Sequence, residues 1–94
     1  MIPGSVSKLS ERTVASAATI EAKADIITLT GTTQVNTITP GLGLAVSQFL
    51  VLVTTGAGVV LGTSGNILVG ATVTTNRAMF LVWMKSLQKW VIGL

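Results

Sequence analysis

The stretch that decides the fold covers residues 26–54 and reads IITLTGTTQVNTITPGLGLAVSQFLVLVT. It is rich in threonine, glycine and branched aliphatic residues, and it lies within a longer run, residues 26–76, that carries no charged side chain. Branched residues are typical of strands, whereas Gly and Pro mark turns. The stretch therefore predicts short β-strands separated by tight turns.

Three strands are predicted within this stretch. Residues 26–30 are strand formers that end at a glycine. In residues 33–39 the side chains alternate between two faces, and one face holds Thr33, Val35, Thr37 and Thr39. Pro40 ends that second segment. Residues 48–54 are the most apolar segment, so this strand has the composition to be buried on both faces.

Flanking segments extend the pattern in both directions. Residues 14–24 are rich in alanine, which suits a helix, but they precede a strong strand, so we favour a strand there and keep the helix as the alternative. Further strands are predicted at residues 59–61, 67–69, 71–74, 79–84 and 89–92. Short strands with turn signals about every 8–12 residues are typical of sandwiches and barrels. We therefore predict an all-β fold, either a short-stranded β-sandwich or barrel or a β-roll.

The composition predicts association with other molecules. The chain has 94 residues, of which 49% are hydrophobic and only 10% charged, and its mean hydropathy is +0.75. A domain of this size buries only about 60–65% of the surface that its unfolded chain exposes. The apolar surface therefore exceeds what one small core can hide, and we expect identical copies or lipid to cover the rest.

Residues 1–13 are predicted to form an extended N-terminal arm, and residues 14–94 a single β domain. The arm contains Pro3, Gly4, three serines and charged residues of both signs, with no periodicity that would bury one face. It also lacks the basic and apolar segments of a secretory signal. We therefore expect synthesis in the cytoplasm.

Residues 42–60 are apolar enough to suggest a transmembrane helix, so a small membrane-inserted protein is kept as an alternative. Gln48, Thr54 and Gly56 interrupt the run of about 20 apolar residues that a spanning helix needs. No Lys or Arg flanks the segment either. We therefore prefer strands, and we expect no membrane partner.

Catalytic chemistry has few candidate residues in this sequence. The chain contains no Cys, His or Tyr, and its three acids are Glu11, Glu21 and Asp25, in or near the predicted arm. A nucleophilic Ser or Thr needs a base, and a metal needs clustered N, S or O ligands. The glycines also lack the Gly-Lys-Ser/Thr spacing of a phosphate-binding loop. We therefore predict that the protein is not an enzyme, and we expect no cofactor, metal ion or small-molecule substrate.

A group of basic and aromatic residues near the C-terminus raises the question of nucleic-acid binding. Arg77, Lys85 and Lys89 lie close in sequence to two tryptophans, Trp83 and Trp90. Lysine at a hairpin turn is commonly a solvated residue that protects an edge strand, and tryptophan commonly anchors a core or an interface. We therefore expect no nucleic-acid partner.

Four short motifs carry a resemblance to a known family. They are LTGTT at residues 29–33, VNTI at 35–38, GNIL at 65–68 and KWV at 89–91. Through them, residues 19–92 resemble a β-rich module that recurs in tailed-bacteriophage virion proteins, both in capsid decoration (cement) proteins and in tail fibres or spikes. The chain departs from that module at residues 85–88, where an Asp/Gly-rich turn is usual, and at its apolar end. The resemblance implies a virion structural protein, which in this class is commonly a homotrimer.

Within that class, the length of the chain favours a capsid decoration protein. A tail fibre or spike has an attachment domain, a shaft and a receptor-binding tip, whereas this chain offers an arm and one module. The resemblance then implies a homotrimer on the capsid surface of the virion, made in the host cytoplasm, with the major capsid protein as its partner. A receptor-binding tail fibre or spike module is the alternative.

Two sets of residues are predicted to carry this function. The core and trimer interface is predicted at the most apolar segment and the tryptophans, namely Phe49, Leu50, Val51, Leu52, Val53, Trp83 and Trp90. Capsid contact is predicted for the arm, at Ile2, Val6, Lys8, Leu9 and Arg12. We expect Lys8 and Arg12 to pair with acidic groups on the shell.

Overall fold

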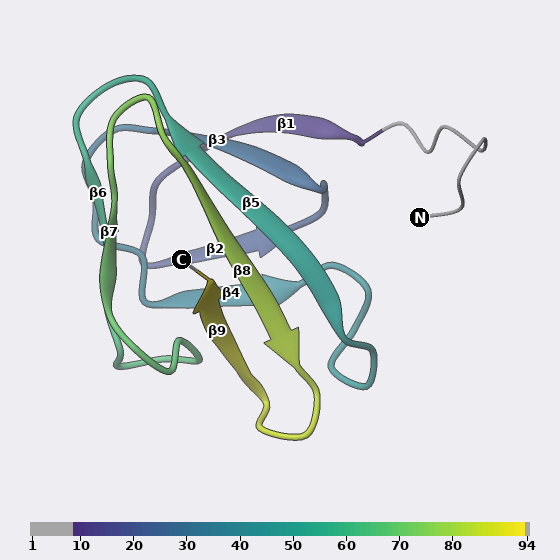
Figure 1. The fold of residues 1–94 in the computed structure, drawn as a ribbon. Coiled ribbons are helices and arrows are strands. Elements are labelled where there is room, and N and C mark those ends of the chain that lie inside the picture. The colour runs from purple at the N-terminus through teal and green to yellow at the C-terminus, as the bar shows by residue number, and fades with distance from the viewer. Residues whose placement is uncertain (1–8, 94) are drawn as a thin grey trace.

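The computed structural model describes residues 9–93, and within that range the chain forms nine β-strands and no helix (Figure 1). The strands are β1 (Glu11–Ala15), β2 (Thr19–Ala22), β3 (Ile26–Thr30), β4 (Thr37–Pro40), β5 (Gln48–Thr54), β6 (Val59–Leu61), β7 (Ala71–Val73), β8 (Ala78–Met84) and β9 (Lys89–Gly93). The predicted all-β class is confirmed. Residues 14–24 form strands, as favoured, and not the alternative helix.

The strands form one five-stranded sheet and two strand pairs. In the larger sheet the order is β1-β3-β5-β8-β9, with β1, β3 and β5 parallel and with β8 and β9 added as antiparallel strands. β2 pairs with β4 in parallel, and β6 pairs with β7 antiparallel. From β1 to β5 the chain therefore alternates between the larger sheet and the β2–β4 pair, as in a β-roll. Figure 1 shows the β2–β4 pair behind β5 and β8.

The core lies between the larger sheet and the two strand pairs. Its fully buried side chains include Ile27, Leu29, Leu50, Leu52, Leu81, Trp83 and Trp90 from the larger sheet, and Ile38, Val59, Leu61 and Val73 from the pairs. Each tryptophan finds the partner that a buried indole N–H needs. Trp83 Nε1 donates to the Leu44 carbonyl at 3.0 Å, and Trp90 Nε1 donates to the Ile38 carbonyl at 2.8 Å. The rings themselves meet edge to face with centroids 5.5 Å apart.

One asparagine takes the place of a strand beside β4. The Asn66 Oδ1 accepts the Ile38 N–H at 2.9 Å, and its Nδ2 donates to the Ile38 carbonyl at 2.7 Å. On its other side, the Asn66 carbonyl accepts the Trp90 N–H at 2.8 Å. The preceding residue is Gly65 because a Cβ there would collide with the carbonyl of Asn36. The Gly-Asn pair of the GNIL motif thus links β4 to β9.

The predicted strand at residues 33–39 differs from the structure. Val35 and Ile38 are both buried although they lie three residues apart, which simple alternation does not allow. The chain bends between them because the N–H groups of Asn36 and of the next residue both donate to the carbonyl of Ala18. The prediction of one continuous strand is therefore wrong, and only its second half belongs to β4.

Of the remaining predicted strands, the one at residues 14–24 is divided between β1 and β2, which lie in different sheets, and the others are confirmed to within one residue, with one exception. Residues 67–69 form no named strand. Ile67 makes an isolated bridge to Trp90, and the next two residues are exposed. The segment lies along the edge of β9 without extending the sheet, because its hydrogen bonds to β9 all involve Trp90.

Candidate interaction surface

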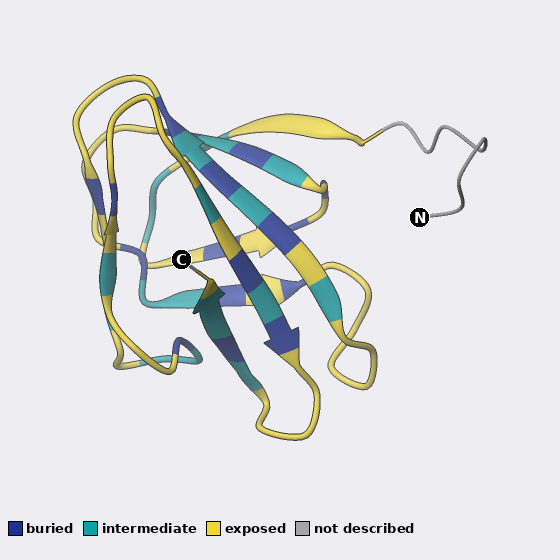
Figure 2. Cartoon of the chain, in the orientation of Figure 1, coloured by how far each residue is buried: buried dark blue, intermediate teal, exposed yellow. Residues whose placement is uncertain are grey.

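The five-stranded sheet has one face on the core and one face turned outward. Side chains alternate along a strand, so the residues between the buried ones form the second face. We call this surface the outer face and define it by Ile26, Phe49, Val51, Val53, Phe80, Val82 and Val91. All seven are exposed or half-buried. In Figure 2, exposed and intermediate residues alternate with buried residues along β5 and β8.

The outer face is continuous across the sheet. The strand register places Phe49 opposite Val82 and Val51 opposite Phe80. Cross-strand partners of this kind have Cβ atoms about 4.5–5.5 Å apart, so their side chains touch. Phe49 is 73% exposed and Phe80 is 53% exposed. The two aromatic rings are therefore the most prominent features of an otherwise aliphatic surface.

Charge is confined to the margins of the outer face. By register, the charged residues on this side of the sheet are Glu11, at the β1 edge, and Lys89, at the β9 edge. The Lys89 Nζ donates to the Gly65 carbonyl at 3.0 Å, beyond the sheet edge. An apolar, aromatic centre bounded by polar residues is the usual anatomy of a protein–protein interface.

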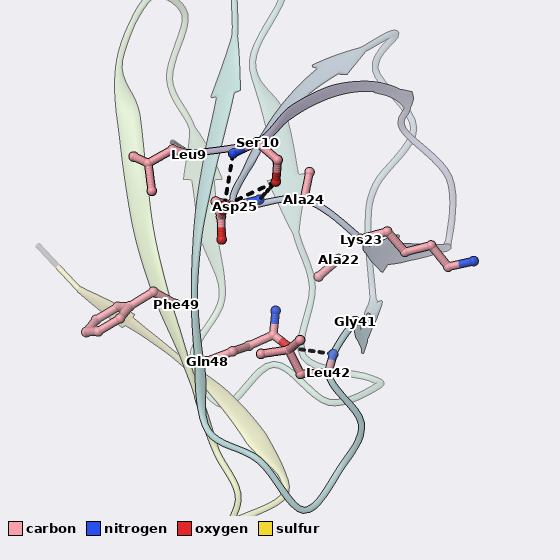
Figure 3. Close-up of a pocket in the computed structure, with 10 residues that line it drawn as sticks. All are labelled: Leu9, Ser10, Ala22, Lys23, Ala24, Asp25, Gly41, Leu42, Gln48 and Phe49. Carbon is pink, nitrogen blue, oxygen red and sulfur yellow. Dashed lines mark hydrogen bonds between the residues drawn. The ribbon is translucent and has the colours of Figure 1, made fainter. Parts of the chain in front are cut away.

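A hollow of about 530 Å³ opens beside Phe49 at one end of the sheet (Figure 3). Its apolar wall includes Leu9, Leu42 and Phe49, and its polar groups include the Asp25 carboxylate and the Gln48 amide. Figure 3 shows the carboxylate and the amide projecting into the hollow from opposite sides. The Gln48 Oε1 accepts the Leu42 N–H at 3.1 Å, which holds the loop after β4 against β5.

Asp25 fixes the segment that leads into β1. Its Oδ2 accepts the Ser10 backbone N–H at 2.9 Å and the Ser10 hydroxyl at 3.1 Å. The Asp25 N–H in turn donates to the Ser10 Oγ at 3.1 Å. These reciprocal bonds tie the start of β1 to the start of β3. Leu9 is therefore held at the rim of the hollow.

The loop between β4 and β5 presents further apolar side chains. Leu42, Leu44 and Val46 are exposed, yet the loop is anchored through its backbone. The Leu44 carbonyl accepts both the Trp83 indole and, at 2.9 Å, the Gln88 Nε2. The apolar surface near Phe49 thus continues onto a loop held in place by hydrogen bonds.

The predicted core and interface residues divide into two groups. Leu50, Leu52, Trp83 and Trp90 are buried in the domain's own core. Phe49, Val51 and Val53 lie on the outer face. In the single chain β5 is buried on one face, because the strand pairs cover only one side of the larger sheet.

The predicted capsid contacts are only partly within the described range. Ile2, Val6 and Lys8 lie outside it. Leu9 is 62% exposed and lines the hollow beside Phe49, whereas Arg12 is exposed and lines a different hollow with Glu21 and Thr39. The two residues are not brought together.

The boundary of the predicted arm also differs from the structure. The predicted arm includes residues 11–13, whereas in the structure these residues belong to β1, which pairs in parallel with β3. Sheet hydrogen bonding therefore begins at residues that show no apolar pattern of their own. An arm on this domain ends before β1.

Sequence reasoning did not select Ile26, Phe80 or Val82 for the interface. The signal was present at residues 79–84, where Phe80 and Val82 alternate with Leu81 and Trp83. Both sets are apolar, so the alternation carries no polarity difference that would mark one face as external.

Titratable groups form no metal-binding cluster in the described range, residues 9–93. Glu21 and Lys23 form an exposed ion pair at 2.9 Å. A search of the same residues for helices finds none with the length and apolarity to cross a membrane. The apolar window at residues 42–60 holds β5 and the start of β6.

Comparison of the chain with protein-family models, with curated proteins and with solved structures gives no match. The function is therefore argued from the surface of the domain and from the motifs of the sequence.

Proposed function

We propose that this chain is a virion structural protein of a tailed bacteriophage, a decoration protein that binds the outside of the capsid as a homotrimer and bridges neighbouring capsomers. The observation that carries the proposal is the outer face, an uncharged surface with two exposed phenylalanines on a domain of 94 residues. Contiguous exposed apolar surface of this kind marks interaction sites. The resemblance of residues 19–92 to phage virion modules supports the virion class.

In this proposal the arm attaches the trimer to the shell. Leu9 is exposed just before β1, and Ile2, Val6 and Lys8 complete the proposed contact of the arm with the major capsid protein; Arg12, which lies on β1, would add a separate contact from the domain. Each apolar contact is modest, since burial contributes about 25 cal/mol per Å². Three arms on one trimer act together, because after one arm binds, the other two bind at a high effective concentration. A trimer whose arms reach different capsomers resists their separation without any chemical step.

Co-sedimentation tests this proposal. The purified chain would be mixed with empty shells assembled from the major capsid protein of the same genome, and the pelleted fraction measured. A variant lacking residues 1–8 retains Ser10, Asp25 and β1, so it tests the arm without removing the hydrogen bonds that anchor β1. We expect the full chain to pellet with shells, and the shortened chain to lose binding while keeping its own assembly mass. A full chain that stays in the supernatant would refute the proposed function.

The hollow beside Phe49 favours one alternative, a receptor-binding module of a tail fibre or spike. The Asp25 carboxylate and the Gln48 amide face a space that Leu9, Leu42 and Phe49 line, which is a suitable setting for a hydroxyl-rich ligand such as a glycan. Binding of the purified chain to host cells or to immobilised glycans, in the absence of shells, would support this alternative. The same binding should then be lost in Gln48→Ala.

A further inference from the structure

We infer that the outer face of the five-stranded sheet is the surface through which copies of this chain assemble, with the faces of three copies turned toward a common axis. The number of copies rests on the proposed function. The choice of surface rests on the structure, and it separates Phe49, Val51 and Val53, which would contact other copies, from Leu50 and Leu52, which are committed to the chain's own core.

The chemistry of the outer face is that of an interface centre. Aromatic residues are enriched and charged residues depleted at the centres of protein–protein interfaces. Here two phenylalanines, 73% and 53% exposed, lie diagonally across β5 and β8 among Val51 and Val82. The β6–β7 pair offers no comparable surface, since its one exposed large hydrophobic residue, Val60, lies opposite Thr72.

The dimensions of the sheet suit a three-fold arrangement. Five strands about 4.8 Å apart are roughly 20 Å wide, and their length is also roughly 20 Å. Three sheets of this width arranged as a triangle would each lie about 6 Å from the axis, close to half of the roughly 10 Å between packed sheets. The side chains of the three outer faces would therefore fill the central space.

The sheet face supplies part of the area that a standard interface needs. A face of roughly 20 Å by 20 Å covers about 400 Å², about half of the roughly 800 Å² that each partner contributes to a standard interface. Leu42 adjoins Phe49 at the hollow and continues the apolar surface onto the loop after β4, whereas Leu9 belongs to the proposed capsid contact.

The charges at the margins favour identical copies as the occupant. Around a three-fold axis the β1 margin of one copy lies next to the β9 margin of the following copy. The first margin carries Glu11 and the second carries Lys89, so the two margins have opposite signs. By register Glu11 is level with Gly93, four residues or roughly 13 Å along β9 from Lys89, so the two side chains do not form a direct pair. Complementary potentials of this kind select the orientation of partners. The arrangement also leaves no charged residue at the centre, where burial without a partner would be costly.

The test is the mass of the assembly in Phe80→Lys, compared with the unmodified chain and with Val60→Lys as the matched control. Val60 is an exposed β-branched residue (45%) outside the five-stranded sheet. Native mass measurement and sedimentation should give three times the 9.7 kDa chain mass for the unmodified chain and for Val60→Lys. Phe80→Lys should shift toward the single-chain mass, with an association constant reduced about 10- to 100-fold for each lost phenylalanine contact.

Near-ultraviolet circular dichroism of Trp83 and Trp90, both buried in the core, reports whether each variant is folded. If Phe80→Lys fails to fold, Phe49→Lys provides the same test at the more exposed ring. A folded variant that keeps the assembly mass of the unmodified chain would overturn the inference and leave the proposed function standing. A single-chain mass for the unmodified protein would overturn the inference and the trimer together, whatever the result of the shell-binding assay.

Discussion

Replacing Asn66 with alanine should destabilise the domain more than any other exposed or half-buried polar substitution of its size. The side chain of Asn66 makes both backbone hydrogen bonds that a neighbouring strand would make to Ile38, at 2.9 and 2.7 Å. In Asn66→Ala the Ile38 carbonyl keeps the Trp90 indole at 2.8 Å, but the Ile38 N–H loses its partner. Ile38 is fully buried, so water does not readily replace the asparagine.

The magnitude follows from these contacts. Leaving a buried donor without a partner costs about 1–3 kcal/mol, and the second hydrogen bond adds about 0.5–1.5 kcal/mol. We therefore expect a loss of about 2–4 kcal/mol. A domain of 94 residues has a free energy of unfolding of roughly 5–14 kcal/mol, so the substitution would remove a large share of it.

Urea unfolding followed by tryptophan fluorescence measures this loss, because Trp83 and Trp90 become exposed on unfolding. The midpoint should fall by about 1–2 M, since the free energy changes by about 1–3 kcal/mol per M of urea. Asn36→Ala is the matched control, because Asn36 makes an exposed side-chain bond to Gln34. All variants are compared at equal protein concentration, since assembly itself adds to stability. Equal midpoints for Asn66→Ala and the unmodified chain would refute the assignment of Asn66 as a substitute for a strand.

Three further predictions concern other contacts of the fold. Gly65→Ala should cost at least about 2 kcal/mol, because the new Cβ meets the Asn36 carbonyl, whereas Gly56→Ala, with open space around its Cβ, should stay near neutral in the same urea assay. Trp83→Phe should cost about 1–3 kcal/mol, because it removes the donor to the Leu44 carbonyl and leaves a smaller ring against Trp90; an unchanged thermal midpoint would contradict this. Ser10→Ala should speed amide hydrogen exchange in β1 while the core strands keep their protection, because it removes one hydroxyl that both donates to and accepts from Asp25; equal exchange in β1 would show that sheet pairing alone holds the strand.

Local composition was sufficient to predict most strands of this fold. Residues 48–54 combine an apolar run with β-branched residues, and β5 has the predicted bounds. The failures occur where a distant segment determines the backbone path. The bend before β4 depends on a carbonyl at residue 18, and the single bridge at residue 67 depends on β9. The residues around the bend and around residue 67 do not show, by their own sequence, that they bond to residue 18 or to β9.

The candidate surface was harder to predict because β5 and β8 are apolar on both sides. Alternation identifies two faces of such a strand, but it cannot say which of them the chain covers. Leu50 and Phe49 are equivalent by composition, and only the position of the strand pairs separates them. Recognition of the outer face therefore required the sheet order and the register.

The absence of charge from residues 26–76 has a physical reason if copies assemble through the outer face. Each strand of the larger sheet would then bury one face on folding and the other face on assembly. An unpaired charge on either face would carry a desolvation cost. Thr28 meets both requirements on β3, since its methyl group packs and its hydroxyl tolerates water before assembly. In the larger sheet, charged residues then remain possible only on the edge strands and in the turns, which is where Glu11, Arg12, Lys85 and Lys89 are found. The same reasoning predicts that a single lysine introduced at Val51, where the outer face is most enclosed by neighbouring strands, should disrupt assembly more strongly than one introduced at Val91, near its margin.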